Sequence, residues 1–168
     1  MDFVENLPKS EGNDVILVIV DHLTKFSHFI SLIHPFTAQE VAWVFLDSVA
    51  KIHGIPKSIV TDQDKIFTSA FWQELFKKLG AGLYMSTTYH PQTDGQTKQI
   101  NQRLEAYLTC MCFTKPRSWN KWKSLAQWWY NSSYHSVIKR IPFEAMFRFK
   151  PPLLPAISGS NPTMAAIG

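Results

Sequence analysis

Two aspartates sixty positions apart in this chain could perform chemistry together. Asp2 stands in Met-Asp-Phe-Val, and Asp62 follows a β-branched stretch at residues 58–61. Aspartates that converge at one edge of a sheet can hold two divalent cations about 4 Å apart, one generating a nucleophile and the other stabilising the leaving oxygen of a phosphoryl transfer. Carboxylate oxygens suit Mg²⁺. We expect Asp2 and Asp62 to lie within about 8 Å of each other, as such a site requires.

Other uses of these acidic residues stay open. An aspartate at the end of a strand is often only the cap of a loop, and Asp21 and Asp64 are the nearest competitors for a metal site. If Asp2 lay on the opposite side of the sheet from Asp62, Asp21 would become the candidate.

The most specific motif is the polar loop Tyr89-His-Pro-Gln-Thr-Asp-Gly-Gln-Thr97. Its Pro and Gly would let it move against a ligand, and Tyr89 could stack on a base or contact a phosphate. A plain turn before a helix would explain the composition but not the whole string. His90 suits a hydrogen bond better than a metal, because imidazole nitrogen is not what a Mg²⁺ site selects.

These residues need a scaffold, and the hydrophobic patterning predicts an α/β domain with a mixed sheet. Strands are predicted at residues 14–21, 25–33, 58–61 and 83–86. The first two are close enough in sequence to form a hairpin. A helix over residues 94–112 follows the polar loop.

The remaining helices are predicted from their caps and apolar stripes. Thr37 and Glu40 form a capping box, and the helix that they start carries an apolar face that extends to Ile52. Two later helices are expected to have N-caps at Ser69 and Ser118. The tryptophans of residues 119–129 have helical spacing, so we interpret them as a core stripe and not as a base-stacking platform.

The composition fits one domain with a substantial core. The chain has 168 residues, of which 45% are hydrophobic, and its net charge of +4 permits a polyanionic partner without requiring one. The two cysteines cannot make a disulfide framework, and no apolar run approaches the roughly 20 residues that span a bilayer, so no membrane partner is expected. We expect a domain over residues 1–150 and a flexible tail, rich in turn-forming residues, over residues 151–168.

The stretch Ser86-Thr-Thr-Tyr-His-Pro-Gln-Thr-Asp-Gly-Gln-Thr-Lys98-Gln-Ile-Asn-Gln-Arg-Leu-Glu105 resembles the catalytic loop and helix of an LTR-retrotransposon integrase of the Gypsy class. In that family two catalytic aspartates are followed by a glutamate, with thirty-five residues between the second and the third acid. Asp2 and Asp62 match the aspartates and the spacing is intact, but Lys98 occupies the position of the glutamate. The resemblance covers nearly all of the chain up to Pro152.

The resemblance implies a ribonuclease H-like fold, a five-stranded mixed sheet flanked by helices, and a two-metal Mg²⁺ or Mn²⁺ site at Asp2 and Asp62. It also implies 3′-processing and strand transfer of element DNA ends into target DNA in the nucleus, with a homo-oligomer among the expected assemblies. We expect DNA contacts at Tyr89, His90, Gln92, Gln96 and Gln99. The family's flanking zinc-binding and DNA- or chromatin-binding modules are not recognised here, and the first strand is expected to be short.

Lys98 predicts impaired catalysis, because an ammonium group stands where the family has a metal-binding carboxylate. Two alternatives remain: a non-enzymatic nucleic-acid-binding or domesticated interaction domain with this fold, and a ribonuclease H proper, which would need four carboxylates and lacks this loop. Ile141 replaces a threonine N-cap of the family, a loss that costs about 1 kcal/mol. Arg148 replaces a turn glycine.

Overall fold

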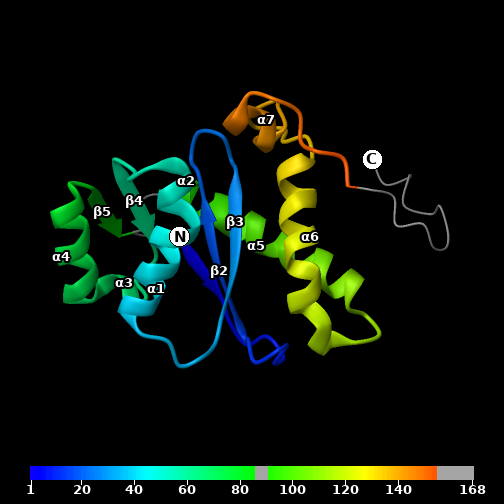
Figure 1. Cartoon of the computed structure of the whole chain (residues 1–168), viewed down its shortest axis with the longest axis horizontal. Helices are drawn as coiled ribbons and strands as arrows, with labels where there is room; N and C mark the ends of the chain where they lie inside the picture. Colours follow the sequence, from blue (N-terminus) through cyan, green and yellow to red (C-terminus); the bar gives the residue numbers. More distant parts are fainter. Residues whose placement is uncertain (86–90, 155–168) are drawn as a thin grey trace.

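The computed structural model describes residues 1–85 and 91–154, in which strands lie between two groups of helices (Figure 1). Within those residues the elements, in chain order, are β1 (Asp2–Val4), β2 (Val15–Val20), β3 (Ser27–Leu32), α1 (Ala38–Phe45), the π-helical turn η1 (Leu46–Ala50), α2 (Lys51–His53), β4 (Ser58–Thr61), α3 (Lys65–Thr68), α4 (Ala70–Leu79), β5 (Gly82–Met85), α5 (Pro91–Met111), the 3₁₀ turn η2 (Pro116–Ser118), α6 (Trp119–Ser132) and α7 (Pro142–Phe147). The expected α/β class is confirmed.

The strands form two sheets in the described residues, where we expected one mixed sheet of five. β1, β2 and β3 make an antiparallel sheet in that order, and β4 pairs with β5 in parallel. All three residues of β1 pair with β2, and within the described residues β1 and β4 are not paired as neighbouring strands. A hydrogen bond from the Met1 ammonium group to the Val60 carbonyl oxygen, at 2.7 Å, links the start of β1 to β4.

β2 is buried on both faces, as its uninterrupted run of β-branched and aliphatic residues predicts. Val15, Leu17 and Ile19 pack in a cluster with α1 and α4. Ile16 and Val18 point to the other face and pack in a second cluster with α5 and α6. The alternation of side chains along the strand therefore divides the core into two halves.

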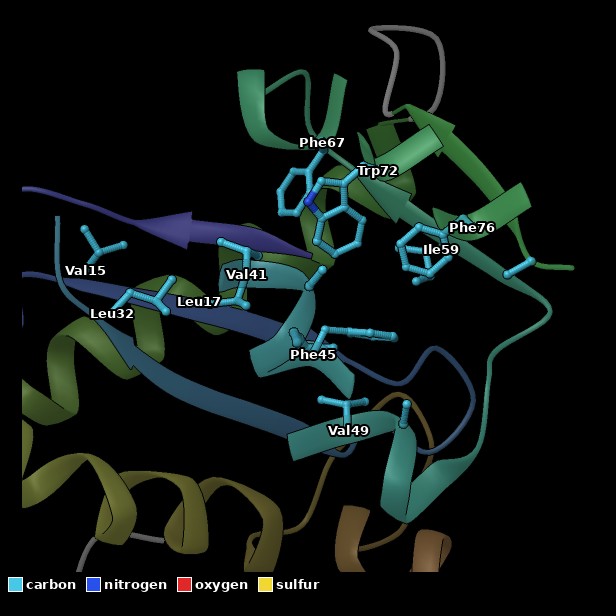
Figure 2. Packing of buried hydrophobic residues seen from close by; sticks show 14 residues of the cluster. Val15, Leu17, Leu32, Val41, Phe45, Val49, Ile59, Phe67, Trp72 and Phe76 are labelled. Carbon is cyan, nitrogen blue, oxygen red and sulfur yellow. The ribbon is translucent and has the colours of Figure 1, made fainter. Parts of the chain in front are cut away.

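Aromatic rings fill the first half of the core (Figure 2). Trp72 and Phe76 of α4 stack with centroids 4.9 Å apart, and Phe67 of α3 meets Trp72 edge-on at 5.4 Å. Phe67 also stacks on Phe3 of β1, with centroids 5.0 Å apart. Such pairs contribute about 0.5–1.5 kcal/mol beyond their buried area. The Phe3–Phe67 contact fixes β1 against α3, and so fixes the position of Asp2.

The caps expected for the first helices are present, with one exception further along the chain. Thr37 and Glu40 form both hydrogen bonds of the capping box, and the Ser69 hydroxyl accepts a hydrogen bond from the backbone of Trp72. Ser118 does not cap α6; its hydroxyl donates to the Lys115 carbonyl oxygen at 2.7 Å, because the 3₁₀ turn η2 precedes the helix.

The prediction that the apolar face of the helix capped by Thr37 extends to Ile52 is wrong, because Ile52 is 52% exposed. The π-helical turn η1 lies between α1 and α2. Its wider turn shifts the helical register, so residues after it no longer continue the face of α1.

Side-chain amides of α6 complete the open edge of the antiparallel sheet. The Asn131 side chain accepts from the Ser27 backbone N–H and donates to the Ser27 carbonyl oxygen, both at 2.8 Å. The Gln127 side chain accepts from the Phe29 backbone N–H at 2.8 Å. These amides take the place of a neighbouring strand for β3.

The tryptophans of α6 are mostly a core stripe, as expected. Trp119 is buried and Trp122 packs against the second cluster. Trp129 is 40% exposed and stacks on Tyr107 of α5 with centroids 5.1 Å apart.

Residues 151–154 remain in contact with the fold where we expected the tail to begin. The indole N–H of Trp128 donates to the Pro152 carbonyl oxygen at 3.2 Å. Residues 155–168 of the expected tail lie outside the described residues. Among the helices of residues 1–85 and 91–154, none is both long enough and apolar enough to cross a membrane.

Candidate active site

Asp2 and Asp62 reach one place from two different sheets. Asp2 opens β1, and Asp62 directly follows β4. The pKa of the Asp62 carboxyl group is raised to about 6, chiefly by burial and further by the negative charge of Asp2 and a hydrogen bond with its side chain. The backbone N–H of Asp64, 3.3 Å from Asp62 Oδ1, opposes that rise. The charge of Asp2 therefore acts on the Asp62 carboxyl group.

The Met1 ammonium group lies near both carboxylates. Burial lowers its pKa to about 6, while the charges of Asp2 and Asp62 act in the opposite direction. The structure thus gathers two acidic groups at the start of β1, beside the backbone nitrogen of Met1.

Helix α5 passes beside Asp2. The Asn101 side-chain amide donates to Asp2 Oδ2 at 2.8 Å, while its Oδ1 atom is buried and has no hydrogen-bond partner among residues 1–85 and 91–154. Lys98 lies three residues earlier, on the same side of the helix, and its side chain is exposed. Position 98 is therefore one helical turn from the residue that touches Asp2.

The two competing aspartates have structural roles. Asp21 accepts from the backbone and the hydroxyl of Thr24, at 2.8 and 2.6 Å, in the turn between β2 and β3. Asp64 caps α3 by accepting from the Ile66 backbone N–H at 2.8 Å. Both serve as turn or helix caps, which is the ordinary use of such residues.

The residues expected to touch DNA are only partly described. Tyr89 and His90 lie outside the described residues. Gln92 belongs to α5, which begins at Pro91, three residues before the predicted start at residue 94. The Gln96 side chain accepts from the Lys25 ammonium group at 2.6 Å, and Gln99 is exposed. Their role in DNA binding stays a prediction.

Three residues of this region were not predicted from the sequence. Asn101 contacts Asp2, Lys25 is 4% exposed and contacts Gln96, and Arg103 acts through its charge on His135. The signal for Asn101 was its place one turn after position 98 beside the apolar stripe of α5. Lys25 had no such signal, because only the tertiary structure brings the turn after β2 to α5.

The donor atoms present fit a divalent cation. Asp2 and Asp62 supply hard carboxylate oxygens, and the unpartnered Oδ1 of Asn101 is an amide oxygen close to Asp2. Within residues 1–85 and 91–154, no group of three or more His, Cys, Asp and Glu side chains gathers in a way that could hold a metal. Asp2 and Asp62 can thus supply two acidic ligands. Lys98 lies one helical turn from Asn101, the residue of α5 that contacts Asp2.

The sequence is similar to part of two retrotransposon polyproteins of Schizosaccharomyces pombe, Tf2-3 and Tf2-4. Each is 39% identical to it over 155 residues, which cover 92% of this chain and 12% of the relative. The chain thus spans about an eighth of the length of these relatives. No protein-family model matches the sequence.

Solved integrase structures share the fold. The simian T-cell lymphotropic virus intasome in complex with the PP2A regulatory subunit B56 gamma contains a chain that matches with a TM-score of 0.71 at 19% identity, covering 99% of this chain and 59% of that one. The HTLV-2 integrase catalytic core in complex with magnesium gives 0.67 at 16% identity, covering 86% and 93%. The BIV integrase core gives 0.64 at 19% identity, covering 88% and 93%.

Proposed function

Because this chain belongs to the integrase catalytic cores of Gypsy-type LTR retrotransposons, we propose that it binds DNA in the nucleus as the core of a DNA-integrating polynucleotidyl transferase. The reactions are 3′-processing and strand transfer, with element ends and target DNA as substrates. The proposal is supported by the effect of the Asp2 charge on the raised pKa of Asp62 and by the hydrogen bond that Asn101 of α5 donates to Asp2.

Asp2 and Asp62 are the ligands that would hold Mg²⁺ or Mn²⁺. The metal site supplies activation of the attacking oxygen and stabilisation of the leaving oxygen when it is filled. Asn101 orients the Asp2 carboxylate through its 2.8 Å hydrogen bond. The partly buried Asp62 releases its proton near pH 6, so it is charged and able to bind a cation at neutral pH.

Lys98 makes this chain a poor catalyst in our proposal. It brings no carboxylate oxygen to the site, so two aspartates must hold what three acidic residues hold in the family. The exposed Lys98 also supports the second candidate function, a DNA-binding domain of the same fold that performs no chemistry. A homo-oligomer is part of the proposal, since HTLV-2 integrase cores have been solved in dimeric and trimeric forms.

Metal titration and strand transfer test these statements together. We expect the unmodified chain to bind Mg²⁺ weakly in calorimetry and to leave a pre-processed DNA end unjoined. Lys98→Glu should bind Mg²⁺ more tightly and recover part of the activity, because it restores the third acidic ligand. Lys98→Gln is the matched control, since it removes the positive charge without adding a ligand.

The outcomes separate the two candidate functions. Turnover by the unmodified chain that disappears in Asp62→Asn would show that two carboxylates suffice, against the impairment proposed here. If Lys98→Glu neither binds Mg²⁺ more tightly nor joins DNA while the chain still binds DNA, the non-enzymatic alternative holds.

A further inference from the structure

A basic cleft lies beside α7, away from the carboxylate pair. Its volume is about 570 Å³, and its lining consists of Arg140, Glu144, Ala145, Arg148, Phe149 and Lys150. Three cationic side chains thus face one acidic side chain. We call this surface the α7 cleft.

The backbone of the cleft holds an arginine in a conformation that favours glycine. Arg148 ends α7 with φ at 64°, in the left-handed region, and its backbone N–H donates to the Glu144 carbonyl oxygen at 2.9 Å. L side chains rarely adopt this conformation, and glycine adopts it readily. The turn itself therefore does not require the arginine side chain.

Further cations connect the α7 cleft to the carboxylate site. The backbone of His135 donates to the Arg140 carbonyl oxygen at 2.9 Å, so the two residues are bridged. Burial, followed by the positive charges of Arg103 and Lys25, lowers the pKa of His135, so both charges act on its imidazole ring.

Two further contacts involve side chains of α5. Lys25 donates to Gln96 at 2.6 Å, and Asn101 donates to Asp2 at 2.8 Å. The turn between β2 and β3 also contacts α7 directly, because the Thr24 hydroxyl lies 3.7 Å from the sulfur of Met146. Lys25 is itself buried, so the cations on this route that DNA could reach are the exposed Arg103 of α5 and those of the α7 cleft.

We propose that the α7 cleft binds the phosphate backbone of DNA as it extends from the carboxylate site. Arginine matches phosphate with two parallel N–H donors, and lysine adds a point charge. Phe149 is 60% exposed and offers a face for a sugar or a base. Continuity with the site favours DNA over an acidic protein, and in this respect the inference rests on the proposed function.

The test measures the salt dependence of DNA binding by fluorescence anisotropy on a labelled duplex, in EDTA. The cleft variant carries Arg140→Gln, Arg148→Gly and Lys150→Gln together. The control variant, with Lys57→Gln, Lys77→Gln and Lys78→Gln, loses the same charge from exposed lysines around β4 and α4, elements that lie apart from α7 (Figure 1). Each phosphate that a variant no longer neutralises should make the slope of log K against log salt shallower by about 0.9.

We expect the cleft variant to flatten the slope and the control to leave it nearly unchanged. Arg148→Gly alone should flatten it by about 0.9 without loss of thermal stability, because glycine suits this turn. This single variant keeps the test valid if the triple variant fails to fold.

Two results would overturn the proposal. One is equal slopes for the cleft and control variants. The other is unchanged DNA binding by a cleft variant that no longer binds a polyglutamate peptide, which would assign the cleft to an acidic protein. Because the assay needs no metal and no turnover, failure of strand transfer does not affect it, and equal slopes would leave the carboxylate site as proposed.

Discussion

Lys98 and Asn101 lie one turn apart on α5 and offer opposite groups to the carboxylate pair. An ammonium held about 4 Å from a divalent cation would be repelled by roughly 8 kcal/mol at an effective dielectric constant of 20. Lys98 is exposed, however, and its flexible stem can turn the charge into water. The missing ligand therefore matters more than the added charge, which is why Lys98→Gln and Lys98→Glu should behave differently.

A histidine pair across β3 and α2 makes stability depend on pH. The Nε2 atoms of His28 and His53 lie 2.7 Å apart, and the pKa of His28 is lowered to about 4 by burial and by the charge of His53. The pKa of His53 is also lowered by burial, with Asp21 acting in the opposite direction. Lys123 lies in the same pocket and adds a further cation nearby.

His28 should weaken the fold as the solution becomes acidic. Between its unfolded value near 6.5 and its folded value near 4, the unfolded chain binds more protons, so the free energy of unfolding falls as pH falls through this window. Urea unfolding at several pH values measures this slope. His28→Gln should flatten it, and the exposed His22→Gln, in the turn after β2, should not. Equal slopes in all three proteins would contradict the assignment.

At the scale of elements, the sequence was sufficient to predict those features whose hydrogen-bond partners lie a few residues apart in the chain. The capping box at Thr37 and Glu40 and the N-cap Ser69 involve residues a few positions apart, and both were predicted. The exposure of Ile52 was not, because a π-helical turn leaves no clear pattern in the sequence. The division into two sheets depends on whether β1 and β4 pair along their backbones, which hydrophobic alternation does not report.

The amide of Asn131 is the element-scale contact that we expect to matter most for stability. It satisfies both backbone groups of Ser27 in a buried environment. Each buried group left without a partner costs about 1–3 kcal/mol, so Asn131→Ala should lower the free energy of unfolding by about 3 kcal/mol.

Asn131→Asp provides a second step in this test. The carboxylate can still accept from the Ser27 N–H but cannot donate to its carbonyl oxygen, so a loss is expected here too. Gln102→Ala, on the exposed side of α5, is the control for loss of a helical amide. Chemical denaturation measures all three, and a change below about 0.5 kcal/mol in Asn131→Ala would be typical of a surface position and would refute the role.

At the scale of the whole molecule, folding itself builds the candidate site. β1, β4 and α5 are far apart in sequence, and folding brings Asp2 to Asn101 and near Asp62. The sequence was sufficient to predict the two aspartates, because their spacing to position 98 matches a known pattern. It could not predict Asn101, Lys25 or the α7 cleft, because their positions follow from the packing of helices against the sheet.

Metal binding should therefore be linked to unfolding. A ligand that binds only the folded chain at ten times its Kd adds about 1.4 kcal/mol to the free energy of unfolding. We expect saturating Mg²⁺ to stabilise Lys98→Glu by at least this amount and the unmodified chain by less. Thermal unfolding with and without Mg²⁺ measures the difference, and Asp62→Asn should show little Mg²⁺ effect.

The pH dependence of the contribution that Asp62 makes to stability should also reverse when Mg²⁺ is bound. Without metal, the folded chain holds a proton on Asp62 up to a pKa of about 6, against 3.8 for the unfolded chain, so the contribution of Asp62 to stability falls as pH rises through this window. With Mg²⁺ the proton competes with the cation, and the stabilisation should instead grow as pH rises above 6. Comparing each protein with Asp62→Asn at the same pH removes the effect of other titrating groups, including His28. If the Mg²⁺ effect in Lys98→Glu were the same at pH 5 and pH 8, Asp62 would not be a ligand.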